Sequence, residues 1–198
     1  MRILLVAVLM LPLAVAPASA GDVYVIDRTR SEAKFEIGYL SSTVAGRLKG
    51  ISGTINLDLI TPTASSVKFS IKVSSVDTGS VELDQLLCSP DFLDTKKFSQ
   101  ITFQSTHIKN TAKTNVYEVA GELTLRGVTK PVKLWVEVGG MVRDGGSLPR
   151  AAFVARTTLN RRDYGLNWSK ILDHGVLVGN ALQVTVNLVA SKQTPDVQ

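Results

Sequence analysis

The strongest constraint on this chain is an alternation of apolar and polar residues that recurs in segment after segment. Between Val67 and Val73, apolar side chains stand at every second position, and Lys68, Ser70 and Lys72 stand between them. A period of two places one set of side chains on the buried face of a strand and the other set in water. Because fully buried parallel strands do not alternate, the pattern predicts antiparallel strands. The alternating segments are residues 23–26, 33–39, 54–59, 67–73, 101–104, 117–125, 132–138, 151–159 and 182–188.

These segments predict an all-β domain of eight or nine antiparallel strands. An open sheet leaves unpaired backbone groups along its two edge strands, and closing the sheet into a barrel removes both edges. A two-layer sandwich would give the same alternation, so the pattern alone is compatible with either architecture. Glycine and proline in residues 125–131 predict a hairpin connection, and Asp144-Gly145-Gly146 predicts a loop tip.

The first twenty residues have the layout of a secretory signal peptide. A positive charge at Arg2 precedes an apolar run over residues 3–15, and Ala18-Ser19-Ala20 forms a small-x-small cleavage site. The alternative is a membrane anchor, which needs about 20 apolar residues, and the run is too short for one. Cleavage after Ala20 predicts an exported, periplasmic protein with no membrane span.

The remaining residues, 21–198, predict one domain, which is long enough to bury a sizeable core. The formal charge of +5 for the full chain is spread along the sequence rather than clustered, which argues against a nucleic-acid partner. Cys88 is the only cysteine, so no disulfide forms within the chain. A small buried apolar residue is the favoured interpretation of Cys88, with a reactive or interchain thiol as the alternative.

The long interruption of the alternation, residues 75–106, is where we expect helices. Ser80 is a suitable N-cap for a helix that starts at Val81, and Ser89-Pro90-Asp91 gives a second helix start signal. Two short helices with apolar faces, placed between strands, would cover the mouth or plug one end of a barrel.

The same block carries a family resemblance. The segments SVDTG at 75–79, SPDFLD at 89–94 and ITFQST at 101–106 resemble the YceI-like family of bacterial periplasmic proteins. GELTLRGVTKPV at 121–132 and NRRDYGL at 160–166 continue the likeness, so the resemblance spans nearly the whole mature chain. It implies a lipocalin-like antiparallel barrel of about eight strands with one or two short helices, built around a long apolar channel. The family often has His and a basic residue near Leu86 and Cys88, so we expect a less polar mouth here.

The resemblance further implies binding of a polyisoprenoid or another long-chain isoprenoid or alkyl lipid, and a homodimer is one expected assembly. We predict that the ligand contacts the inward apolar residues and a few residues at the mouth. Arg161 is the predicted partner of an anionic headgroup, because its guanidinium binds phosphate or carboxylate through two parallel hydrogen bonds. Trp168 is predicted to line the mouth. The predicted ligand-binding residues are Phe35, Ile37, Tyr39, Ile55, Leu57, Phe69, Ile71, Leu86, Phe92, Phe103, Leu123, Leu134, Phe153, Arg161 and Trp168.

Two other functions compete with lipid binding. A small isomerase or lyase could act on a hydrophobic substrate in the same cavity, and a structural envelope protein would have its barrel filled by side chains, which is the commoner fate of inward apolar residues. The chain has only two histidines, His107 and His174, and lacks HExxH and GxSxG motifs. We therefore predict a non-catalytic protein with no catalytic residues, no metal site and no cofactor.

Overall fold

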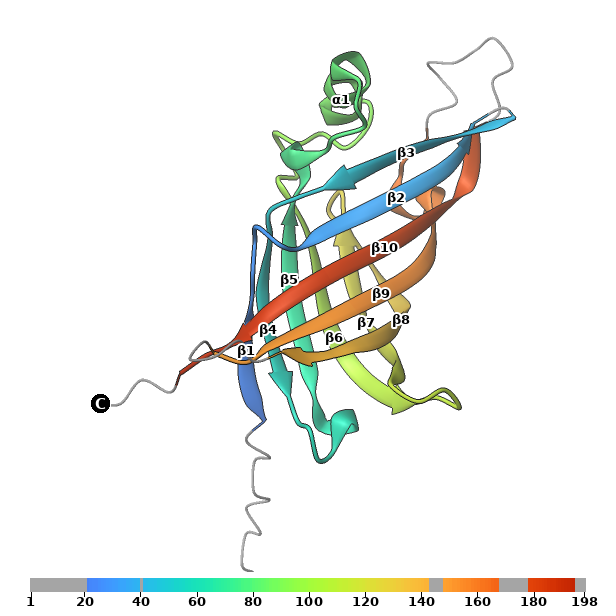
Figure 1. The fold of residues 1–198 in the computed structure, drawn as a ribbon. Helices are drawn as coiled ribbons and strands as arrows, with labels where there is room; N and C mark the ends of the chain where they lie inside the picture. The colour runs from blue at the N-terminus through green and yellow to red at the C-terminus, as the bar shows by residue number, and fades with distance from the viewer. Residues whose placement is uncertain (1–20, 40, 143–147, 168–177, 195–198) are drawn as a thin grey trace, which may run out of the picture.

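The computed structural model describes residues 21–39, 41–142, 148–167 and 178–194, and these residues form an antiparallel β-barrel (Figure 1). Alternation in the sequence explains the strands, because most of the inward side chains of the predicted segments are buried or half-buried. The strands are β1 (Asp22–Ile26), β2 (Glu32–Tyr39), β3 (Ser42–Leu48), β4 (Ile51–Leu57), β5 (Ser66–Lys72), β6 (Gln100–Asn110), β7 (Val116–Leu125), β8 (Val128–Val142), β9 (Arg150–Asn160) and β10 (Val178–Lys192).

Eight of these strands close into a ring. Neighbours pair in the order β1-β4-β5-β6-β7-β8-β9-β10, and β10 pairs back onto β1. In that closing pair, Tyr24 lies opposite Lys192 and Ile26 lies opposite Ala190. The predicted eight-stranded barrel is therefore confirmed. The sandwich alternative is wrong, because a sandwich has no such closing pair.

The hairpin of β2 and β3 extends this ring at one end. β10 pairs with β1 only from Ala190 to Lys192. Its earlier part, between Val178 and Asn187, pairs with β2 instead. β3 then pairs with β2 along its whole length. The sequence STVAGRL of β3 does not alternate strictly, which is why the alternation pattern did not predict this strand.

The predicted first helix is confirmed as α1 (Val81–Cys88), which the Ser80 hydroxyl caps by accepting a hydrogen bond from the Leu83 amide at 3.3 Å. The predicted second helix at Ser89-Pro90-Asp91 is wrong. The Ser89 carbonyl accepts hydrogen bonds from the amides of Phe92 and Asp94, and Asp94 has a φ of 47°. The backbone therefore reverses in turns instead of continuing as a helix.

The two ends of the barrel differ in what covers them. In Figure 1, α1 stands at the upper end, while the connection from β4 to β5 with η1 (Pro62–Ala64) lies at the lower end. The upper end also holds η3 (Arg161–Tyr164), and η2 (Val73–Ser75) precedes α1. Buried side chains fill the interior at the α1 end; they include Ile71, Val73, Val76, Leu87, Phe92, Phe103, Leu125, Tyr164 and Leu166.

Arg126 ties together the segments at the α1 end. Arg126 and Gly127 form the two-residue turn of the predicted hairpin, with φ values of 52° and 73°. The guanidinium of Arg126 donates to the carbonyl of Pro90 at 3.1 Å and to the carbonyl of Gly165 at 3.2 Å. One side chain thus links the β7–β8 hairpin, the turn after α1 and the residue that follows η3.

Among the described residues, none of the helices is long and apolar enough to cross a membrane.

Candidate functional site: an apolar cavity at one end of the barrel

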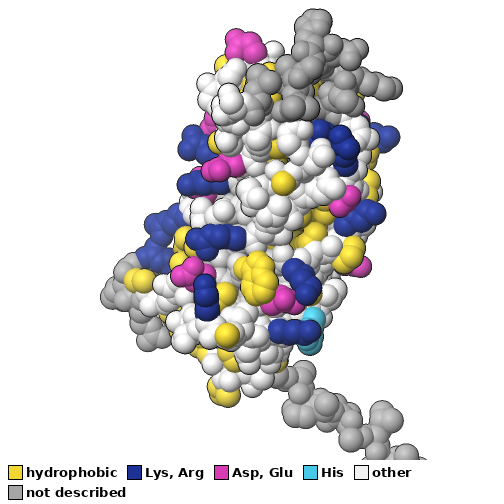
Figure 2. Space-filling model, turned by 90° about the vertical axis from the view of Figure 1, so that its right-hand side faces the viewer, with side chains coloured by type: hydrophobic (Ala, Val, Ile, Leu, Met, Phe, Trp, Pro, Cys, Tyr) yellow, Lys and Arg dark blue, Asp and Glu magenta, His cyan; other side chains and the backbone are white. Residues whose placement is uncertain are grey.

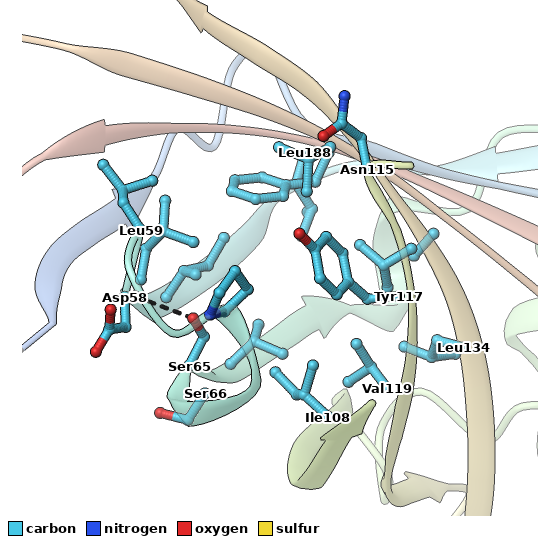
Figure 3. A pocket seen from close by; sticks show the side chains of 18 of the residues that line it. Asp58, Leu59, Ser65, Ser66, Ile108, Asn115, Tyr117, Val119, Leu134 and Leu188 are labelled. Atoms are coloured by element: carbon cyan, nitrogen blue, oxygen red, sulfur yellow. Dashed lines mark hydrogen bonds between the residues drawn. The ribbon is translucent and has the colours of Figure 1, made fainter. Parts of the chain in front are cut away.

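The other half of the barrel, toward η1, encloses a cavity of about 290 Å³ (Figure 3). Its wall is apolar almost throughout, because inward positions of seven strands, β4 to β10, carry aliphatic or aromatic side chains there. The lining residues are Ile55, Leu57, Asp58, Leu59, Pro62, Ser65, Ser66, Val67, Phe69, Ile108, Asn115, Tyr117, Val119, Leu134, Val136, Val138, Gly140, Met141, Phe153, Ala155 and Leu188.

Two phenylalanines mark the inner limit of the cavity. Phe69 of β5 lines it, and Phe103 of β6 stacks beside Phe69 with ring centroids 5.3 Å apart and ring planes inclined at 29°. The two residues face each other across the β5–β6 ladder. Phe103 is only 1% exposed, so its ring belongs to the filled half of the interior.

Asp58 lies at the open end, where it stabilises the turn before η1. Its Oδ1 accepts hydrogen bonds from the amides of Ile60 at 2.9 Å and Thr61 at 2.8 Å, and its own amide donates to Ser65 Oγ at 2.9 Å (Figure 3). An aspartate that bonds the amides two and three residues further along is typical of a turn. The carboxylate therefore holds the rim of the cavity in shape.

Tyr117, near the start of β7, supplies a polar group on the cavity wall. Its ring lies among aliphatic side chains, and its hydroxyl points into the open space (Figure 3). Among the described residues, no hydrogen bond to this hydroxyl is found. A phenol in this position can donate a hydrogen bond to a ligand oxygen, or accept one.

The structure brings part of the predicted site together. Five of the predicted ligand-binding residues line the cavity, namely Ile55, Leu57, Phe69, Leu134 and Phe153. The prediction is wrong for Leu86, because it lies on the outward side of α1 with 39% of its surface exposed. Trp168 lies outside the described residues. The other predicted apolar residues do not line the cavity: Phe35, Ile37 and Tyr39 on β2, and Ile71, Phe92, Phe103 and Leu123 in the filled half.

The predicted role of Arg161 is also corrected. Arg161 is 4% exposed, and its guanidinium donates to the backbone carbonyls of Leu166, Val178 and Gly179, the last at 2.8 Å. Burial, and secondarily the charge of Arg162, lower the pKa of Arg161. The side chain lies in η3, at the opposite end from the cavity, and its hydrogen bonds hold the chain on either side of residues 168–177. It does not contact a headgroup bound in this cavity.

Several lining residues were not predicted as ligand contacts, although the sequence signalled most of them. Tyr117, Val119, Val136, Val138, Ala155 and Leu188 all stand on the inward side of predicted alternating strands. Leu59 also stands in a predicted alternating segment, but Pro62 and Met141 are different, because they lie in η1 and near the end of β8, outside those segments. Only the three-dimensional arrangement shows that these residues meet at the mouth.

A second hollow, of about 560 Å³, lies on the side of the barrel where the β8–β9 pairing ends at Trp135 and Arg156. Two of its four charged residues form ion pairs: Lys133 with Glu118 at 3.1 Å, and Arg156 with Glu137 at 3.4 Å. On the face that Figure 2 shows, Lys, Arg, Asp, Glu and apolar side chains are interspersed. The hollow is open and polar, in contrast to the cavity. No cluster of metal-binding side chains exists in the part of the chain that the structure describes.

This closed antiparallel barrel, filled at one end and hollow at the other, belongs to the class of lipocalin-like barrels. Within that class, the family model of the YceI-like domain matches residues 24–190, and the chain belongs to the YceI-like family. A UPF0312 protein of Shewanella baltica is 38% identical over 157 residues, which cover 78% of this chain and 81% of that protein. A UPF0312 protein of Pseudomonas savastanoi pv. phaseolicola is 36% identical over the same shares.

Two solved structures share the fold. BcnA of Burkholderia cenocepacia superposes with a TM-score of 0.73 at 23% identity, covering 84% of this chain and 99% of BcnA. A polyisoprenoid binding domain from Saccharophagus degradans superposes with a TM-score of 0.67 at 16% identity, covering 86% of this chain and 98% of that domain. At these identities, the likeness establishes the barrel architecture.

Proposed function

We propose that this protein binds a polyisoprenoid or another long-chain amphiphilic lipid in the apolar cavity of its barrel, without chemical turnover. The observation that carries the proposal is the cavity, which is apolar on nearly all sides and lies in the half of the barrel away from α1. The structural likeness to a domain described as polyisoprenoid binding supports the same ligand class. Membership in the YceI-like family supports it as well.

The energetics favour such a ligand. Burial of one methylene group contributes about 0.8 kcal/mol, so a chain of several carbons binds tightly without specific polar contacts. The polar end of the lipid would lie toward Asp58, Ser65 and Ser66 at the rim. The Tyr117 hydroxyl would contact an oxygen near the head of the chain.

The non-catalytic role is part of the proposal. Among the described residues, the cavity lining contains neither histidine nor cysteine, and its one carboxylate, Asp58, serves the turn that precedes η1. An isomerase or lyase would instead show product formation from a bound hydrophobic substrate. Loss of that turnover in a Tyr117→Phe or Asp58→Asn variant would favour the enzyme over the carrier.

The direct test is native mass spectrometry of protein purified without detergent, before and after lipid extraction. We expect a mass adduct that extraction removes, and rebinding of a fluorescent isoprenoid alcohol to the extracted protein. Val136→Asp should abolish the binding, because it places a carboxylate in the cavity wall. Trp135→Asp is the matched control, because the neighbouring side chain is half exposed on the outer face.

Circular dichroism must show that both variants fold. If the extracted wild-type protein binds no isoprenoid alcohol and the native protein carries no adduct, the proposed function is wrong. Equal loss of binding in the two folded variants would place the ligand somewhere other than the cavity.

Export is the remaining part of the proposal. Residues 1–20 support cleavage after Ala20 and a periplasmic location, and N-terminal sequencing of the protein from the periplasmic fraction would test both. The homodimer stays a prediction, which sedimentation of the purified protein would test.

A further inference from the structure

We propose that the stacked rings of Phe69 and Phe103 form the floor of the cavity and set the length of hydrocarbon that the barrel accepts. The proposal rests on the proposed function, since it concerns the depth to which a lipid chain enters. It also names the ligand segment: a terminal stretch of roughly twelve carbon atoms or fewer, about two isoprene units.

The position of the floor follows from the strand ladders. On β5, Phe69 lines the cavity but the next inward residue, Ile71, does not. On β7 the lining stops at Val119, so that Gly121 falls outside it. On β9 it stops at Ala155. On all three strands the lining thus ends before the α1 end of the strand, and Phe69 is its last residue on β5.

Gly121 explains how the Phe103 ring takes its place in this floor. A Cβ atom at residue 121 would lie 2.5 Å from Cζ of Phe103, closer than two carbon atoms can approach. The ring therefore occupies the space that a side chain on β7 would otherwise fill. Phe103 is 1% exposed and its ring stacks on that of Phe69, so the two rings hold each other in place.

The cavity volume sets the scale of the ligand. A dry apolar cavity of about 150 Å³ holds one benzene molecule. A cavity of about 290 Å³ therefore has room for roughly twelve carbon atoms. The additional carbons of a longer chain stay outside the cavity and gain no further burial in the barrel.

The experiment measures the affinity of the extracted protein for linear isoprenoid alcohols of two, three and four isoprene units, by displacement of a fluorescent isoprenoid alcohol. Each buried methylene raises affinity about fourfold. For the wild type, we expect little gain beyond two units. In Phe69→Leu and Phe103→Leu, the gain should continue to three units and reach roughly tenfold or more.

Two further variants complete the experiment: one that should shorten the accepted chain, and one control that should leave it unchanged. Ala155→Leu adds bulk just above the floor, so the gain should end at a shorter chain, measured with short linear alcohols. Phe92→Leu is the control, because Phe92 is 4% exposed but does not line the cavity, and its chain-length profile should match the wild type.

The proposal is overturned if the Phe69 and Phe103 variants fold and bind, yet keep the wild-type chain-length profile. It is also overturned if Phe92→Leu shifts the profile as much as they do. Failure of the proposed function looks different, because no alcohol of any length would then bind to the wild type.

Discussion

The Tyr117 hydroxyl stands out at the scale of single residues, because it is a polar group directed into an apolar cavity (Figure 3). We expect Tyr117→Phe to weaken the binding of an isoprenoid alcohol by about 0.5–1.5 kcal/mol, the net value of one hydrogen bond. The matching hydrocarbon without the hydroxyl should bind both proteins equally. Isothermal titration calorimetry measures both affinities, and an equal loss for the two ligands would contradict the predicted hydrogen bond.

Arg161 has a structural role at the same scale. We expect Arg161→Lys to lower the free energy of unfolding by about 1–3 kcal/mol, because an ammonium group cannot reach the carbonyls that the guanidinium holds apart. Urea unfolding measures this loss. The neighbouring Arg162 is exposed, so Arg162→Lys should change stability by less than about 0.5 kcal/mol. Affinity for an isoprenoid alcohol should be unchanged in Arg161→Lys, and a large loss would restore the headgroup role.

At the scale of elements, an ion pair joins β3 to the segment before α1. Arg47 donates from Nε and Nη2 to Asp77 Oδ2 at 3.0 and 2.8 Å, and the backbones of the two residues also pair. The hydrogen bond from Arg47, more than any other interaction, lowers the pKa of Asp77. Because the folded-state pKa lies below the unfolded value of about 3.9, this contribution is present above that pH and is lost as the pH falls further.

We therefore expect Asp77→Asn to flatten part of the stability decline below about pH 4. The measurement is urea unfolding between neutral and strongly acidic pH, for the wild type and the variant. Glu36→Gln removes an exposed carboxylate from the neighbouring strand β2 and serves as the control. Identical acid slopes for Asp77→Asn and the wild type would show that the Arg47–Asp77 pair does not contribute.

How well the sequence predicted each element depended on how the element is stabilised. Strands with one buried and one solvent-exposed face were predicted because their sequences alternate between apolar and polar residues. β3 was missed because it extends a hairpin from the barrel wall and buries only Leu48 fully. The second helix was predicted from capping residues alone, and these same residues serve equally well in turns, which the left-handed φ of Asp94 completes.

The functional site shows a different limit, which belongs to the whole molecule. Alternation identified inward side chains on every strand of the barrel wall, but it could not tell which end of the barrel they fill. The answer depends on the volumes of side chains that meet across the barrel, such as Phe103 against Gly121. Both alternatives posed by the sequence, a channel and a filled interior, occur in this molecule at opposite ends.

A bound lipid should stabilise the whole barrel. A ligand that binds only the folded state at a concentration of 100 times its Kd adds about 2.7 kcal/mol to the free energy of unfolding. We expect a higher Tm for the extracted protein after addition of an isoprenoid alcohol, measured by differential scanning calorimetry. Folded Val136→Asp should show no such increase. A shift of the same size in that variant would mean that the alcohol acts outside the cavity.

The pairing of β1 with β10 has a consequence for synthesis and turnover. This pair joins residues near opposite ends of the sequence, with Tyr24 opposite Lys192. The ring cannot close on a ribosome-bound or partly translocated chain that still lacks β10. Closure must wait for the last strand, and such long-range pairing makes folding slow. A chain that ends before β10 would leave β9 and β1 as edge strands with unpaired backbone N–H and C=O groups, which promote aggregation. We therefore expect nascent fragments to need chaperones or to be degraded.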